Sequence, residues 1–260
     1  MFRRLPPFGG DPRAVAEVVN NIMDGKTNNT GTITLGTGWA TSTTITDARI
    51  GIDSVIIVIP YSDAAENDAA PYGCFTNNTD QTAPSVGSTA VVVYDSTEEA
   101  SGVYLSSSSR LYVRNYGIYN VQFSIQLTNL ANDAQYADVW FRLNGTDVPR
   151  SASRFDLPAR KSAGVPSHTI GTVNTFIEMQ AGDYVEIAGT TSSTDIGLTS
   201  YAADAVIPRP AIPAAIVTVQ HIAPKSSGSV YISSQTNGSA VISHFANNTA
   251  NKTYKYVIVG

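Results

Sequence analysis

The chain has 260 residues, enough for one or two domains that each bury a core. Only 14% of the residues are charged and the formal net charge is -5, so the sequence lacks the basic surface by which proteins bind nucleic acid. The single cysteine cannot form an internal disulfide, and the apolar run at residues 55–59 is far shorter than the roughly twenty residues of a membrane-spanning helix. We therefore expect no nucleic-acid partner, no membrane insertion and no disulfide framework.

The only helix pattern lies near the start of the chain. Asp11 fits an N-cap, Pro12 fits the first helical position, and Gly25 fits a stop signal. The apolar residues between them fall on one face and are the candidate assembly residues: Val15, Val18, Val19 and Ile22. Such an amphipathic helix needs a partner surface. That surface is either the helix's own domain or another chain or larger assembly, and both possibilities stay open.

Strand patterns occur at both ends of the chain. The first group covers residues 32–35, 41–46 and 52–60, and the last group covers residues 229–234, 239–244 and 253–259. Each group is marginal alone, because a few strands cannot bury an apolar face. We therefore expect the two groups to form one small discontinuous β-sandwich, interrupted by an inserted domain.

The middle of the chain is also rich in strand patterns. Residues 119–128 alternate between apolar and polar without exception, which predicts a strand with one buried face. Further strands are predicted at residues 137–143, 173–179, 184–188 and 214–222. No helical pattern lies between them, so an antiparallel sandwich is favoured over a parallel α/β sheet.

These patterns predict an all-β protein with one short N-terminal helix. The predicted order is an N-terminal arm and helix at 1–25, a discontinuous outer β domain at 26–62 plus 229–260, a linker at 63–89, an inserted domain at 90–222 and a second linker at 223–228. Residues 63–88 mix Ala, Asn, Asp, Pro, Gly and Thr without a period, which predicts a loop.

Three short motifs in the middle region resemble the jelly-roll heads of the complement and tumour-necrosis-factor superfamily. They are GIY at 117–119, RLNGTDVP at 142–149 and AGDYV at 181–185, and their order and spacing agree with the family over roughly residues 90–222. The resemblance implies a ten-strand antiparallel jelly-roll sandwich that assembles as a homotrimer.

Other segments resemble structural proteins of tailed phages. The segment VWFRLNGTDVP at 139–149 looks like the form of the jelly-roll motif that occurs in tailed-phage structural proteins. Three further segments resemble a short phage protein whose two halves are almost contiguous: GGDPRAVAE at 9–17, TDARIG at 46–51 and VYISSQTNGS at 230–239. The likeness covers most of the chain. The sequence departs from the immune-system family in lacking a collagen stalk and a secretion signal, so complement and cytokine functions are not carried over.

The sequence contains few candidates for catalytic or metal-binding residues. His168, His221 and His244 lie in different segments without metal-ligand spacing, and no serine-nucleophile motif is present. Carboxylate pairs such as Asp133 with Asp138 or Asp183 with Glu186 are more typical of solvated surface than of a glycan-cleaving site. We predict no enzyme activity and no catalytic, metal or cofactor-binding residues, and the receptor-binding residues are unknown.

Residues 5–11 carry prolines and glycines where a signal peptide needs an apolar stretch, so we expect no export signal. The resemblance implies a virion protein made in the host cytoplasm. The first hypothesis is a homotrimeric tail fibre or receptor-binding knob, anchored by the helix and outer domain. The alternative is a capsid decoration or head-fibre protein, and the third is a glycan-degrading tail enzyme. Expected partners are further copies of the chain, capsid or tail proteins, and a host surface glycan or protein, for which a receptor binder needs sugar-sized pockets near residues 129–137 and 189–205.

Overall fold

The computed structural model describes residues 11–24, 28–62, 65, 70–83, 85–224, 230–248 and 250–260. The chain divides into two compact units, one of residues 1–68 with 230–260 and the other of residues 69–229. Both are built from antiparallel sheets, and the protein is an all-β sandwich with one short helix. Within the described ranges, no helix is long and apolar enough to cross a membrane.

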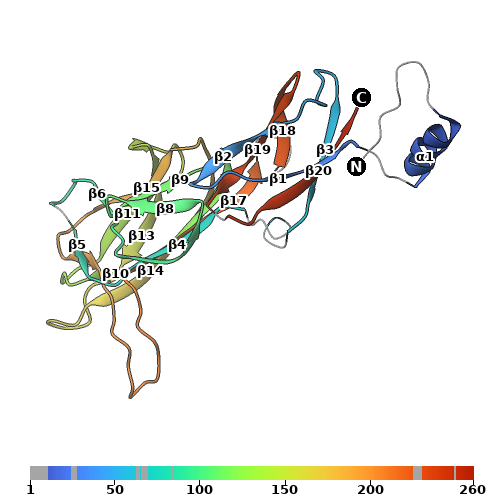
Figure 1. Ribbon diagram of the computed structural model, residues 1–260. Coiled ribbons are helices and arrows are strands. Elements are labelled where there is room, and N and C mark those ends of the chain that lie inside the picture. The colour runs from blue at the N-terminus through green and yellow to red at the C-terminus, as the bar shows by residue number, and fades with distance from the viewer. Residues whose placement is uncertain are drawn as a thin grey trace. The chain divides into compact units, whose positions relative to one another are not determined.

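The smaller unit joins the two ends of the chain. Its elements are α1 (Pro12–Met23), β1 (Thr30–Thr34), β2 (Ala40–Thr46), β3 (Val55–Pro60), β18 (Val230–Thr236), β19 (Ser239–Asn247) and β20 (Thr253–Val259). One sheet has the order β1-β20-β3 and the other has the order β18-β19-β2. Early strands, drawn in blue, therefore lie hydrogen-bonded beside late strands, drawn in red (Figure 1).

Aliphatic and tyrosine side chains fill the space between these two sheets. The buried set is Ile45, Ile50, Ala240, Ile242, Tyr256 and Ile258, with Ile33, Ile56, Val58, Val230 and Ile232 packed against it. Residues from both chain ends contribute, so neither end has a complete core of its own. This shared core explains why three strands from each end are stable together.

The larger unit contains two antiparallel sheets. The first has the order β5 (Gln81–Thr82), β16 (Ile196–Leu198), β10 (Gly117–Asn129), β17 (Ala215–Pro224), β4 (Tyr72–Asn77) and β7 (Ser96–Ser101), with β14 (Ser167–Met179) on the other edge of β10. The second has the order β12 (Thr146–Asp147), β11 (Gln135–Leu143), β15 (Tyr184–Thr191), β9 (Arg110–Val113) and β8 (Val103–Ser106), with β13 (Ser153–Leu157) paired to β11 and β6 (Ala90–Val91) paired to β15.

The chain crosses repeatedly from one of these sheets to the other. β10 and β11 lie in opposite sheets, as do β13 and β14, β14 and β15, and β15 and β17. This alternation makes residues 69–229 an antiparallel two-sheet sandwich, which we call the jelly-roll unit after the fold that the sequence resemblance implies. Every apolar member of the alternating run on β10 is buried: Tyr119, Val121, Phe123, Ile125 and Leu127. The period of two therefore marks the core face correctly.

The loop predicted at residues 63–88 is wrong in part, because β4 occupies Tyr72–Asn77 and pairs with β17. Its sequence, YGCFTN, lacks strand character because Gly73 stands beside the buried Phe75. A Cβ on Gly73 would lie 2.6 Å from Cε2 of Phe75, so packing requires glycine where propensity would favour a larger residue. The predicted helix stop at Gly25 lies outside the described residues.

Replacing Phe141 by alanine tests the jelly-roll core. The side chain is fully buried, and its ring centre lies 5.3 Å from that of Phe123 across the two sheets. We expect Phe141→Ala to lower the free energy of unfolding by about 3–5 kcal/mol in urea denaturation. Val206→Ala, at a position that is 91% exposed, should change it by less than about 0.5 kcal/mol. Equal effects of the two substitutions would contradict this core.

Candidate functional site

Helix α1 presents the predicted apolar stripe. The Asp11 carboxylate accepts a hydrogen bond from the Arg13 backbone N–H at 3.1 Å, and Pro12 follows this N-cap. The four candidate assembly residues all lie on this helix: Val15, Val18, Val19 and Ile22. Val18 is half-buried, and the other three are 37–57% exposed. The stripe is therefore available to a partner surface.

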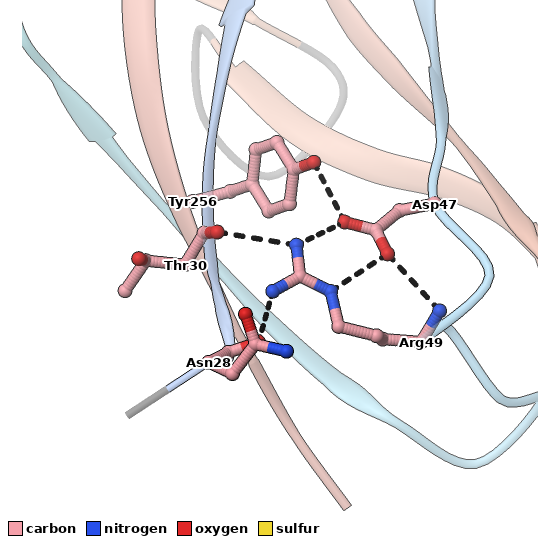
Figure 2. A network of polar contacts seen from close by, with 5 residues as sticks. All are labelled: Asn28, Thr30, Asp47, Arg49 and Tyr256. Carbon is pink, nitrogen blue, oxygen red and sulfur yellow. Dashed lines mark hydrogen bonds and ion pairs between the residues drawn. The ribbon is translucent and has the colours of Figure 1, made fainter. Parts of the chain in front are cut away.

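The strand that follows α1 is held in place by a polar network (Figure 2). Arg49 forms an ion pair with Asp47 and donates hydrogen bonds to the backbone carbonyls of Asn28 and Thr30. The Tyr256 hydroxyl donates to the Asp47 carboxylate at 2.9 Å. Hydrogen bonding from Arg49 keeps the pKa of Asp47 well below its ordinary value. The network joins the chain just after α1 to the last strand.

The sheet β1-β20-β3 has a second apolar face, turned away from the core. On the edge strand β3, Val55, Ile57 and Ile59 are 49–59% exposed. Val259 and Val257 of β20 pair with the first two of these residues. An exposed aliphatic edge strand is normally blunted by charge or covered. We call these five residues the β3 face.

The jelly-roll unit has an unusual sheet face of its own. Between His168 and Glu178, β14 directs only uncharged side chains away from the core: Ile170, Thr172, Asn174 and Phe176. The neighbouring strands β10 and β17 continue this uncharged surface: Asn120, Gln122, Ser124, Gln126, Ile216, Thr218 and Gln220. Phe176 is 67% exposed and Ile170 is 62% exposed. We call this surface the β14 face.

One side-chain oxygen beneath the β14 face has no hydrogen-bond partner among the described residues. Asn120 pairs across the strands with Phe176, and its side-chain oxygen is buried without a hydrogen-bond partner among the described residues. A buried unpaired carbonyl oxygen costs free energy. The β14 face therefore combines one exposed aromatic ring, Phe176, with a buried acceptor that lacks a partner among the described residues.

An ordered arm extends from the jelly-roll unit at residues 199–213 (Figure 1, orange). Tyr201 pairs with Ile212 and Asp204 pairs with Arg209 as antiparallel bridges. The Asp204 carboxylate accepts backbone hydrogen bonds at the tip, and these hydrogen bonds lower its pKa. The tip residues Val206 and Ile207 are 91% and 70% exposed, so the arm presents an apolar end.

A cavity of about 90 Å³ lies between the sheets of the jelly-roll unit. Aliphatic residues such as Leu127 and Val139 line it, together with the Thr190 and Thr191 hydroxyls, which have no hydrogen-bond partner among the described residues. Part of the lining comes from residues 189–198, where the sequence predicts a sugar-sized pocket for a receptor binder. The lining is mainly apolar, which does not resemble a glycan site.

The histidines and the candidate carboxylate pairs lie in separate structural settings. His168 bonds the Tyr201 hydroxyl, His244 bonds Thr43, and burial lowers the pKa of His221. Asp138 pairs with Arg154, while Glu186 is buried and accepts from Ser109. No group of three or more His, Cys, Asp or Glu among the described residues could hold a metal ion.

Sequence reasoning found the stripe on α1 but missed both exposed sheet faces. The signal for the β3 face was present, since residues 55–59 are apolar at every position rather than at alternate positions. The β14 face had only a weak signal, because Ile170 and Phe176 lie six residues apart among polar residues. No family model matches the chain, and no curated protein matches it either.

Replacing Asp47 by asparagine tests the network at β1. The depressed pKa means that the folded state binds protons less readily than the unfolded chain, so the stabilisation is present above about pH 4 and is lost as pH falls below it. We expect Asp47→Asn to lower the unfolding free energy of the smaller unit by about 1–3 kcal/mol at pH 7. The variant should also flatten the acid-induced loss of stability in pH-dependent denaturation.

Asp53→Asn is the matched control, since Asp53 is an exposed carboxylate in the same unit. It should change the unfolding free energy by less than about 0.5 kcal/mol. An unchanged acid slope in Asp47→Asn would contradict the role given to the network.

Proposed function

We propose that the protein is a structural component of a tailed-phage particle. In this proposal it forms a homotrimer through the jelly-roll unit and is attached by α1 and the smaller unit, so that the jelly-roll unit projects as a tail fibre or receptor-binding knob. The phage assignment rests on the sequence resemblance. The single structural observation that supports assembly is the uncharged, partly apolar β14 face.

The composition of the β14 face favours contact with protein over contact with water. A solvated sheet face normally carries charged residues, and depletion of charge together with exposed aromatic residues is typical of the centre of a protein interface. Phe176 and Ile170 supply the apolar contacts.

The residues that resemble the short phage protein make the framework of the smaller unit. Gln235 donates to the backbone carbonyls of Gly51 and Ser54, and the Asn237 side chain accepts from the Ile52 N–H. These bonds join the segment at 230–239 to the last residue of TDARIG, Gly51, and to the residues that follow it. The resemblance therefore falls on residues that hold the two chain ends together, which supports a common attachment module.

Capsid decoration is the second candidate function. The observation that favours it is that the smaller unit carries two exposed apolar surfaces, the stripe on α1 and the β3 face. A capsid shell could bury such surfaces in many copies. The copy number per particle separates the candidates, because a fibre or knob is present at few sites and a decoration protein at many.

The mass in solution tests the homotrimer. We expect three times the chain mass of 27.5 kDa in light scattering. Phe176→Asp should convert the protein to monomers at micromolar concentration, since charging the centre of an interface costs about 2 kcal/mol or more per contact.

Val206→Asp places the same charge on the exposed arm tip and should leave the trimer intact. Circular dichroism of Phe176→Asp should match the wild type, since the side chain is 67% exposed in the folded unit. A wild-type monomer of 27.5 kDa, or a trimer unaffected by Phe176→Asp, would overturn the proposed interface.

A further inference from the structure

Two uncovered apolar surfaces belong to the same unit of the chain. The stripe on α1 exposes Val15, Val19 and Ile22. The β3 face exposes a second set of β-branched side chains: Val55, Ile57, Ile59 and Val259, with Val257 half-buried beside them. Both surfaces consist of aliphatic residues, so packing one on the other would remove apolar area of both from water.

We propose that α1 of each chain packs its stripe on the β3 face of that same chain. The helix then forms a third layer over the sheet β1-β20-β3, and the polar side of α1 is what a particle or a neighbouring copy meets. This goes beyond the proposed attachment role, because it assigns the four candidate assembly residues to packing within the chain.

The length of the connection supports docking within one chain. Residues 25–27 separate Asp24 from Asn28, and the four Cα-to-Cα steps between these two residues span at most about 14 Å. β20 lies between β1 and β3, so the β3 face begins about 10 Å from β1. Arg49 holds the carbonyls of Asn28 and Thr30, which fixes where the connection starts. The helix can therefore reach the face.

The dimensions of the two surfaces also agree. A helix of twelve residues is about 18 Å long, and a strand of six residues is about 20 Å long. A single helix of this length is marginal in water and needs tertiary contacts to persist. A short connection keeps the local concentration of α1 at its own β3 face in the millimolar range, which favours that face over the face of a second copy or a particle protein.

Cross-linking in the full-length protein tests this proposal. Val19→Cys and Ile57→Cys are combined in a Cys74→Ser background, treated with a short bismaleimide, and analysed on denaturing gels with peptide mapping. We expect a link between residues 19 and 57 within one chain. Glu17→Cys with Ile57→Cys is the matched control, because Glu17 lies on the opposite side of α1 and should react at least about fivefold less.

Hydrogen exchange of α1 gives a second readout without a cross-linker. The α1 amides should be protected roughly tenfold or more over an unstructured chain, and Val19→Asp or Ile57→Thr should remove that protection while Asn20→Asp keeps it. Amides of β2 and β19 report whether the variants remain folded. Links between chains, equal reaction of the Glu17 control, or α1 protection that is absent or insensitive to both variants would each overturn the proposal. These outcomes are independent of whether the jelly-roll unit forms a trimer.

Discussion

The last strand of the chain, β20, lies between the early strands β1 and β3 in one sheet. β20 pairs with β1 on one edge and with β3 on the other. Residues 253–259 can therefore enter this sheet only after the intervening chain has brought them back beside β1 and β3. The Tyr256 hydroxyl on β20 adds a hydrogen bond to Asp47, whose partner Arg49 holds the carbonyls before and within β1. The smaller unit is therefore closed by contacts of very large sequence separation, and the intervening segment forms a complete core of its own.

The two units present different kinds of uncovered surface. In the jelly-roll unit, the β14 face combines the exposed Phe176 ring with amides and hydroxyls and carries no charge, which suits a partner that can both pack and exchange hydrogen bonds. In the smaller unit, the five residues of the β3 face are aliphatic, and the one charged neighbour on the outward side of β20 is Lys255, which pairs with Ile59. A helix stripe of the same chemistry on a short connection suits the β3 face better than a solvated or polar partner. The proposed function thus separates self-association in one unit from internal packing and attachment in the other.

Much of the fold could be predicted because burial leaves a period in the sequence. The alternation at residues 119–128 marks the core face of β10, and Asn237-Gly238 marks the turn between β18 and β19. The prediction failed where packing opposes propensity, as in β4, where Gly73 makes room for Phe75. The sheet faces could not be predicted in full, because they depend on which strands become neighbours. Phe176 and Asn120 share a face only through the pairing of β14 with β10.

Native-state hydrogen exchange of the full-length chain under increasing denaturant tests most directly whether the two chain ends fold as one unit. We expect the amides of β1, β3 and β20 to share one opening free energy, different from that of β10 and β17. The reason is that β1, β3 and β20 belong to one core to which both ends of the chain contribute. If β20 opened with a free energy unrelated to that of β1 and β3, the chain ends would not form a common unit, and both the attachment role and the docking of α1 would lose their basis.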